Sequence, residues 1–586
     1  MSGSPLPPKH SQILVIGGGP SGSYAASVLS NEGMQVTLLE AAGFPRYHIG
    51  ESLIPSARHY LKFIDAEEKL VQAGFKHKPG AAIKFNQHKK EGYTDFVALG
   101  IHNSSWNVVS AVFLRAPYTM ELTSHAPHKI RSQFDDLLLQ HARTCGVKVF
   151  ERTKVDSVEL STDNTSRPVA VNWTRTSKSA SSSPGSHRAT GRTSFDYLVD
   201  ASGRAGVMST KYMKNRHFNE SLKNIAIWGY WRGAGTYGVG TSREGAPWFE
   251  ALTDESGWAW FIPLHDGTTS VGVVMNQQMF KESAQKPSHS PFSPEAAPNP
   301  RGSTMTSRYL AALSNAPQVV ALLSEQARMV EDSVKSASDY SYKATEHAGL
   351  NFRISGDAGA FIDPCFSSGI HLAFTSAMSA AASICAAIRG DCTEEAAGKW
   401  HTERVMTSYT RFQLVVLSAY KQFRNQAEDV LSDIDEDNFD RAFAMFRPVI
   451  QGGADIGIRL SEDELQRSLD FCANLFNPTT PEQHADLVLG GEIAKDLLDV
   501  NKPVVDRAVL NEALHVRDEK DGEARLGEND DVRSERRGET QLVLDKINAR
   551  RVIQPEYAIS NMENEGIDGY AVRLQRGNLG LNKVIS

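Results

Sequence analysis

The sequence predicts a mixed α/β protein, with features of the α+β class, built from a nucleotide-binding part, a β-rich part and a helical C-terminal part. A short apolar strand runs into a glycine-rich turn near the N-terminus, short β-branched and aromatic runs fill the middle, and apolar residues recur at helical spacing after Ser376. The expected boundaries are 11–400 for the nucleotide-binding part with sheet inserts at 81–125 and 206–345, 401–510 for the helical region, and 511–586 for a charged, flexible tail.

Composition excludes several classes of protein. The chain has 586 residues, and its 62 Lys and Arg against 69 Asp and Glu leave a net charge of -7, which offers no positive field for nucleic acid. The five cysteines lack the spacing of a zinc site, and no run approaches the roughly 18 apolar residues of a membrane span. We therefore expect a cytoplasmic protein with no bound metal, no nucleic-acid partner and no membrane span.

The first 40 residues contain a complete strand-helix-strand start. The strand 13–16 enters a glycine-rich turn, a helix follows, and a second strand at 36–39 ends in Glu40. Such a turn lets the backbone approach a pyrophosphate at the N-terminus of a helix, and the acid takes the ribose hydroxyls. The predicted dinucleotide contacts are Gly17, Gly18, Gly19, Ser21, Gly22 and Glu40. The acid favours FAD or NAD over NADP.

The middle of the chain is predicted to be β-rich. Strand-like runs lie near 196–203 and 224–233, and a strand pair at 258–276 turns at Asp266-Gly267. The Ser/Pro-rich segments 175–194 and 282–307 contain almost no large apolar side chains, so we expect them to form mobile surface loops.

Two segments further on indicate which dinucleotide is bound. Gly356-Asp357 closes an extended run, and Asp363-Pro364 is followed by a turn at 367–370 that opens a helix. With these segments the sequence resembles the FAD-dependent monooxygenase superfamily of the p-hydroxybenzoate hydroxylase type, which implies a Rossmann-like FAD-binding domain with a β-sheet substrate domain. The resemblance also implies that Asp357 holds ribityl oxygens, that 200–204 is a third fingerprint, and that Arg131 contacts the cofactor.

Three further segments narrow the resemblance. Phe44-Pro45-Arg46 with 49–53, the run 78–85, and the WxWxIP motif at 258–263 look like a flavin-dependent halogenase, closest to the fungal enzymes that halogenate polyketides. The likeness covers about residues 11–500. It adds Arg46, Glu51 and Ile370 to the implied cofactor contacts. Taken alone, alternating tryptophans are more often one buried face of a sheet.

The resemblance implies a catalytic lysine and a halide site. Lys84 would hold or carry the halogen, while Ser368 and Gly369 would bind chloride or bromide at a helix N-terminus. Lys84 on its own is a surface lysine in the ordinary case, but its apolar surroundings at 81–85 argue for burial, which would lower its pKa. FADH2 and O2 would generate hypohalous acid, which attacks an electron-rich carbon of a phenolic or enolisable polyketide.

No second nucleotide motif is visible, so a separate flavin reductase is expected to supply FADH2. Two alternatives remain open at this point. A flavin-dependent aromatic hydroxylase would share the cofactor site, but Lys84 and WxWxIP argue against it. A non-catalytic binding protein like the Rab GDP-dissociation inhibitors would share the nucleotide fold, but Gly356-Asp357 and Arg131 argue against that.

Overall fold

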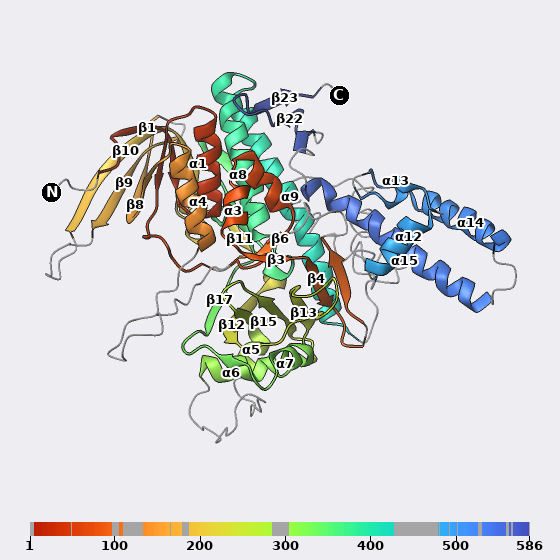
Figure 1. Cartoon of the computed structure of the whole chain (residues 1–586). Helices are drawn as coiled ribbons and strands as arrows, with labels where there is room; N and C mark the ends of the chain where they lie inside the picture. The colour runs from red at the N-terminus through yellow and green to blue at the C-terminus, as the bar shows by residue number, and fades with distance from the viewer. Residues whose placement is uncertain are drawn as a thin grey trace.

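The computed structural model shows two large sheets joined by two long helices, with a helical unit to one side (Figure 1). It describes residues 5–48, 50–88, 90–96, 105–108, 133–163, 166–177, 187–283, 304–426, 479, 481–491, 493–500, 502–524, 530–557, 562–563 and 566–584. Arg131 and Ile49 lie outside these residues.

The first sheet is largely parallel and confirms the predicted nucleotide-binding fold. Its strands follow the order β19 (Ala348–Gly349), β20 (Phe352–Ile354), β10 (His187–Asp200), β1 (His10–Ile16), β2 (Val36–Leu39) and β7 (Lys148–Phe150), with β9 (Pro168–Ser177) and β8 (Thr153–Leu160) attached beside β10. Helices α1 (Pro20–Asn31) and α4 (Gln133–Thr144) pack against one another beside it (Figure 1). The carboxyl ends of β1, β2, β10 and β20 therefore meet at one edge, where open α/β sheets bind ligands.

The second sheet has two differently covered faces. It runs in the order β16 (Arg328–Met329), β12 (Asn224–Arg232), β15 (Thr268–Asn276), β14 (Gly257–Pro263), β13 (Trp248–Ala251), β4 (Gly80–Lys84) and β5 (Gly92–Asp95), with β17 (Lys335–Ser338) paired to β12. One face packs on α6 (Met305–Leu313) and α7 (Pro317–Leu323), near α5 (Gln277–Ser283). The other face carries Trp258 and Trp260 and turns toward α9 (Glu394–Phe423).

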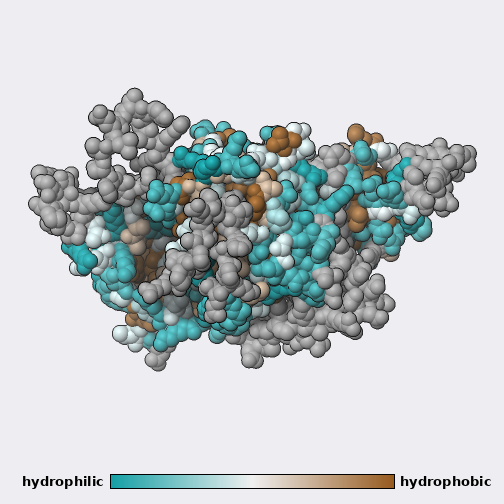
Figure 2. Space-filling view, turned by 90° about the horizontal axis from the view of Figure 1, so that it is seen from below, coloured by the Kyte–Doolittle hydropathy of each residue, from teal (hydrophilic) through white to brown (hydrophobic). Residues whose placement is uncertain are grey.

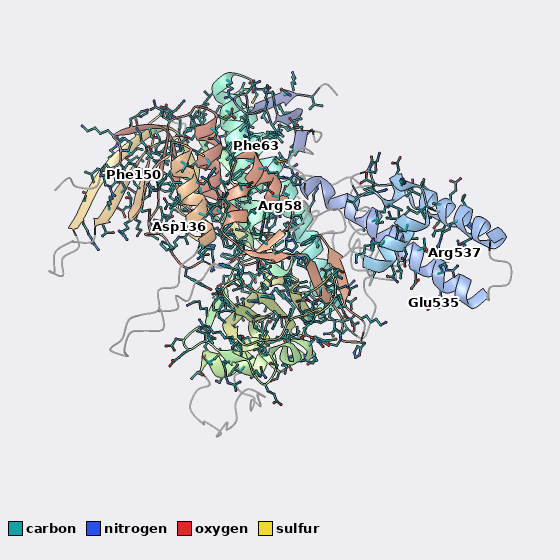
Figure 3. All side chains as sticks on the ribbon, in the orientation of Figure 1. Arg58, Phe63, Asp136, Phe150, Glu535 and Arg537 are labelled. Atoms are coloured by element: carbon teal, nitrogen blue, oxygen red, sulfur yellow. The ribbon has the colours of Figure 1, made fainter. Side chains whose placement is uncertain are left out.

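Shorter elements complete the body of the protein. They are α2 (Ser56–Phe63), α3 (Glu67–Gln72), the pair β3 (Lys76–Lys78) and β6 (Ser105–Asn107), and the sheet of β11 (Arg216–Phe218), β18 (Tyr342–Ala344) and β21 (Ala360–Phe361). Arg58 on α2, which is labelled in Figure 3, stacks over the ring of Trp106 on β6 at 3.9 Å and also pairs with Glu67. The stacking contact holds β6, and with it the paired strand β3, against α2.

Helix α8 (Gly369–Arg389) runs through the centre of the molecule (Figure 1). Within the described residues it is the one helix with the length and hydropathy of a membrane span, but 89% of that window is buried inside the protein. Its small side chains allow close packing against α1 and α9. Figure 2 shows a largely hydrophilic outer face, with hydrophobic residues in separate spots.

The sequence analysis was wrong about parts of two segments. Residues 187–194, predicted to be loop, belong to β10, where they pair with β9. The predicted loop at 282–307 lies mostly outside the described residues. The charged tail is also folded where it is described, because α14 (Arg507–Ala524) and α15 (Asp530–Tyr557) pack with α12 (Pro481–Gly490) and α13 (Lys495–Leu498) around their own apolar core. Arg537 on α15 forms an ion pair with Asp518 on α14 (Figure 3).

The last described segment, the hairpin β22 (Tyr570–Arg573) and β23 (Gly580–Lys583), closes onto the N-terminal half of the protein. The carboxylate of Glu32, at the end of α1, accepts the backbone N–H groups of Gly577 and Leu579 and pairs with Arg389 of α8, each at 2.9 Å. Glu32 is buried, so these bonds compensate for taking its charge out of water.

Replacing Glu32 with Ala should therefore lower the free energy of unfolding by about 3 kcal/mol, the scale for breaking a buried ion pair. The matched control is Asp568→Ala, which removes the exposed pair between Lys399 and Asp568 and should cost less than about 1 kcal/mol. Urea denaturation of both variants measures the difference. Equal stabilities would show that this carboxylate does not hold the hairpin.

Candidate functional site

A cavity of about 590 Å³ lies between the two sheets, at the carboxyl edge of the first. Nine of the predicted site residues line it: Gly17, Gly19, Ser21, Glu40, Arg46, Glu51, Asp357, Gly369 and Ile370. Its far end is walled by Trp258 and Trp260 of the second sheet. Residues more than 300 positions apart in the chain thus form one enclosed site.

The glycine-rich turn is built for close backbone contact. Gly17 has φ +101°, and a Cβ there would lie 2.2 Å from the carbonyl oxygen of Ala201. A Cβ on Gly22 would lie 2.0 Å from the carbonyl oxygen of Gly17. Gly19 differs, because its Cβ would meet only the Arg46 guanidinium at 3.5 Å. Two of the glycines are therefore required by the protein's own packing, whereas Gly19 keeps the cavity wall open.

Glu40 is fixed at the end of β2 by backbone donors. Its two carboxylate oxygens accept the N–H groups of Gly18 and Ala42, each at 2.7 Å, and Arg46 lies 3.8 Å away. The carboxylate is buried at the cavity wall, as a ribose-binding acid should be. Gly18 does not itself line the cavity, and its role is to donate the hydrogen bond that positions Glu40.

The opposite wall is closed by the Gly356-Asp357 turn. Ser21 on α1 shares a 2.5 Å hydrogen bond with Ser355, and Gly356, at φ +62°, donates its N–H to Ser376 on α8. These bonds bring the first and last cofactor segments together beside the N-terminus of α1. Gly19 with its free space, the buried carboxylate of Glu40 and the N-terminus of α1 together fit a dinucleotide such as FAD.

The fingerprint at 200–204 is held by its aspartate. Asp200 accepts the N–H groups of Ser202 at 3.1 Å and Met208 at 2.6 Å, and Gly203 and Arg204 line the cavity. Burial raises the pKa of Asp200, and these hydrogen bonds oppose that shift. Asp200 therefore shapes the wall without itself lining it.

The predicted halide segment lies at the start of α8. Ser368 is the residue before the helix, and its buried hydroxyl has no hydrogen-bond partner in the part of the chain that the structure describes. Ser367 and Gly369 line the cavity on either side of it. An unpaired hydroxyl beside the N-terminal N–H groups of a 21-residue helix can bind a small anion.

The WxWxIP strand forms the aromatic wall. The indole rings of Trp258 and Trp260 lie 5.7 Å apart, and their N–H groups donate to Tyr420 at 2.8 Å and to Ser270 at 3.1 Å. Tyr420 in turn donates to Asp363, at 2.7 Å. Hydrogen bonds therefore hold both indole rings in place. Through Tyr420, Trp258 is linked to Asp363, which lies four residues before the halide segment begins at Ser367.

Lys84, the predicted catalytic lysine, faces away from this cavity. Side chains alternate along β4, and Ala81 and Ile83 share the core of Trp258 and Trp260, whereas Ala82 belongs to the core on the opposite face. Lys84 follows Ala82 on that opposite face and lines a separate hollow with Tyr237 and Gln318. Lys84 is half-buried on that face, and its catalytic role stays a prediction, because the sequence pattern did not specify the face.

Lys78 has the properties that were predicted for Lys84. It is 2% exposed, and its ammonium donates to Ser52 at 2.8 Å and to the carbonyl oxygen of Leu53 at 3.0 Å. Ser52 lines the cavity. Burial lowers the pKa of Lys78 to about 7. Lys78 is the first residue of the run 78–85 that carries the family resemblance. A lysine directly before Pro79 and three small residues was the sequence signal that could have identified it.

Glu51 lies next to Ser52 and takes part in a buried network. It accepts a 2.5 Å hydrogen bond from Tyr230, whose hydroxyl lies 3.4 Å from that of Tyr47. Burial raises the pKa of Glu51, so its carboxyl group favours the neutral form relative to an exposed glutamate. Glu51 lines the cavity and Lys78 lies one hydrogen bond behind it, and burial shifts the pKa of the first upward and that of the second downward.

The comparisons with known proteins agree with this geometry. The profile of a family described as tryptophan halogenase matches residues 12–121 and 115–456. The chain is 48% identical over 575 residues to the flavin-dependent halogenase armH1 of Armillaria mellea, covering 98% of each chain. It is 42% identical to the sulochrin halogenase gedL of Aspergillus terreus, covering 98% of this chain and 94% of the relative.

Solved structures give the same result. The myxobacterial chondrochloren halogenase CndH aligns with a TM-score of 0.58 and 25% identity, over 76% of this chain and 90% of its own. CmlS, a flavin-dependent halogenase, aligns with a TM-score of 0.59 and 25% identity, over 88% of this chain and 78% of its own. The chain is thus similar to halogenases in both sequence and fold.

Proposed function

Because the chain belongs to the flavin-dependent halogenase family, we propose that it installs chlorine or bromine on an electron-rich carbon of a phenolic or enolisable polyketide. The observation that carries this proposal is the single cavity that joins the dinucleotide cradle to an aromatic chamber and, through Ser52, to a buried lysine. The name of the Aspergillus relative, a sulochrin halogenase, supports a polyketide substrate. A phenol or enol is suitable because its oxygen stabilises the cation formed when the carbon attacks halogen.

Different residues of this chain would bind the cofactor and the halide. Gly17, Gly19, Glu40 and Asp357 would hold FAD, whose reduced form would give O2 two electrons, so that one oxygen atom leaves as water and the other oxidises the halide to hypohalous acid. The N–H groups at Gly369 and the hydroxyl of Ser368 would hold the halide. This arrangement keeps the halide beside the cofactor and away from the substrate.

We place Lys78, rather than Lys84, at the substrate end. An amine with a pKa near 7 can exist in both forms under physiological conditions. It can donate a hydrogen bond to hypohalous acid and thereby polarise it, or it can take up the halogen on nitrogen and release water. We infer that the rings of Trp258 and Trp260, which line the cavity, keep this end apart from the cofactor end.

FADH2 is expected to come from a separate flavin reductase, and the enzyme is expected to act in the cytoplasm. NADH alone should therefore give no turnover, whereas NADH with an added flavin reductase, FAD, O2 and chloride should add the mass of chlorine minus hydrogen to a phenolic polyketide such as sulochrin. Mass spectrometry with and without chloride measures this. Stoichiometric NADH oxidation by the chain alone, with a hydroxylated product, would instead assign a hydroxylase.

A further inference from the structure

Trp258 is the ring of the aromatic wall whose anchor lies outside the second sheet. The neighbouring ring of Trp260 donates to Ser270, which belongs to the adjacent strand β15. Trp258 instead donates to the hydroxyl of Tyr420 on α9, 162 residues later in the chain, at 2.8 Å. One ring is therefore held by its own sheet, and the other by a helix from a different part of the protein.

Packing restrains Trp258 on one side only. Away from the cavity it contacts the rings of Phe249 and Trp260, whose centroids lie 6.1 and 5.7 Å from its own. A ring that borders a cavity has no packing partner on that side, so van der Waals contacts restrain its rotation less than in a filled core. The hydrogen bond to Tyr420 supplies a restraint that packing does not.

Tyr420 is a fixed acceptor for this bond. It is 2% exposed, and its hydroxyl donates to Asp363 at 2.7 Å while it accepts from Trp258. Its ring packs against that of Phe423 with centroids 5.6 Å apart, and the guanidinium of Arg424 lies 5.2 Å from its centroid. Both the ring and the hydroxyl of Tyr420 are thus held by residues other than Trp258.

Asp363 connects this anchor to the halide segment. One of its oxygens accepts from Tyr420, and the other accepts the backbone N–H of Cys365 at 3.2 Å, within the turn Pro364–Phe366 that leads into the halide segment. Burial raises the pKa of Asp363 to about 6, and its hydrogen bonds oppose that rise, so the group is a carboxylate at neutral pH. A charged acceptor binds the Tyr420 hydroxyl more strongly than a neutral one.

We propose that Tyr420 is a positioning residue, which holds the indole ring of Trp258 between the cofactor end of the cavity and Lys78. The proposal rests on the halogenase function and adds to it a residue outside the motifs that carry the family resemblance. Each FADH2, with O2, chloride and one proton, yields FAD, water and one hypochlorous acid. Acid that escapes past a released ring is therefore lost from the halogenated product one for one.

The first test needs neither cofactor nor substrate. NMR of protein with isotope-labelled tryptophan should show eight indole N–H signals, one for each tryptophan, and Trp258→Phe identifies the signal of Trp258 by removing it. Tyr420→Phe should move that signal upfield, because the N–H loses its acceptor. Tyr409→Phe is the matched control on the same helix, since it removes a buried hydroxyl that has no partner within the described residues, and it should leave the signal in place.

The second test measures where hypochlorous acid goes. The FAD-loaded enzyme receives a flavin reductase, NADH, O2, chloride and sulochrin, together with taurine, which traps escaped acid as N-chlorotaurine. Tyr420→Phe should raise the ratio of N-chlorotaurine to chlorinated sulochrin about tenfold, the scale of one lost hydrogen bond. Trp258→Phe should raise it at least as much, and the double variant no further, because both changes remove the same bond. This ratio does not depend on the amount of folded protein, and Tyr409→Phe should not change it.

The two tests separate this inference from the halogenase function. An unmoved indole signal in Tyr420→Phe, an unchanged ratio, or a further rise in the double variant would show that Tyr420 does not position the ring. A parental enzyme that forms no hypochlorous acid would refute the halogenase function. If the parental enzyme forms the acid but leaves sulochrin unchanged, the substrate class is wrong, and the indole signal decides whether Tyr420 holds Trp258.

Discussion

Replacing Lys78 with Ala or Met is expected to abolish halogenation while FAD binding and the reoxidation of FADH2 by O2 continue. The residue is buried one hydrogen bond away from the cavity, because its ammonium donates to Ser52, which lines the cavity. The loss should reach at least about a thousandfold, the scale for removing one positioned donor in the transition state. Product formation by mass spectrometry and flavin reoxidation by absorbance measure the two processes separately.

The matched control for this prediction is Lys84→Ala. Lys84 lies six residues later, on β4, and faces the side of the second sheet that is turned away from the cavity, so its loss should leave halogenation nearly unchanged. Lys78→Arg should not restore activity, because a guanidinium stays charged and cannot give up its proton. An inactive Lys84→Ala enzyme beside an active Lys78→Ala enzyme would return the catalytic role to Lys84.

Because the pKa of Lys78 is lowered, the pH dependence of the free energy of unfolding can also be compared between the parent and its Lys78 variants. Between about pH 7 and its ordinary value of 10.5, the unfolded chain binds a proton at this lysine that the folded protein does not bind. The free energy of unfolding should therefore rise with pH across this window, by an amount on the order of 4–5 kcal/mol. Lys78→Met should remove this rise, because methionine does not titrate. A variant with the same pH dependence as the parent would show that Lys78 is not the buried titrating group.

The second large effect is expected at Gly19. A Cβ at this position meets only Arg46 at 3.5 Å, so Gly19→Val should fold normally while its side chain enters the cavity. Loss of the backbone approach to the pyrophosphate should weaken FAD at least about a hundredfold, as a steric conflict of about 3 kcal/mol would. The purified variant should be colourless, and a flavin titration gives the dissociation constant.

Two other glycines provide the comparison. Gly229→Ala in β12 places a methyl group at an ordinary 3.4 Å from its neighbours and should leave FAD affinity unchanged. Gly22→Ala would place a methyl group 2.0 Å from a backbone oxygen, so it should lower stability as well as FAD binding. Full flavin occupancy in Gly19→Val would show that the dinucleotide does not pass this turn.

The nucleotide-binding turn, the acid after β2 and the WxWxIP strand could all be predicted from the sequence. Each is a local pattern in which spacing along the chain fixes the geometry, so Gly17, Glu40 and Trp258 lie where they were expected. Local spacing also identified the segment from Lys78 to Lys84 as important. It did not indicate which of the two lysines lies next to the cavity.

That question depends on the three-dimensional arrangement, because Pro79 separates β3 from β4 and the two lysines therefore belong to different sheets with different neighbours. Side-chain alternation holds within one strand and does not carry across such a break. The C-terminal hairpin shows the same limit. The hairpin falls within the region 511–586 that was expected to form a flexible tail, yet it is held by Glu32, more than 500 residues earlier, and a partner at that distance leaves no trace in local sequence.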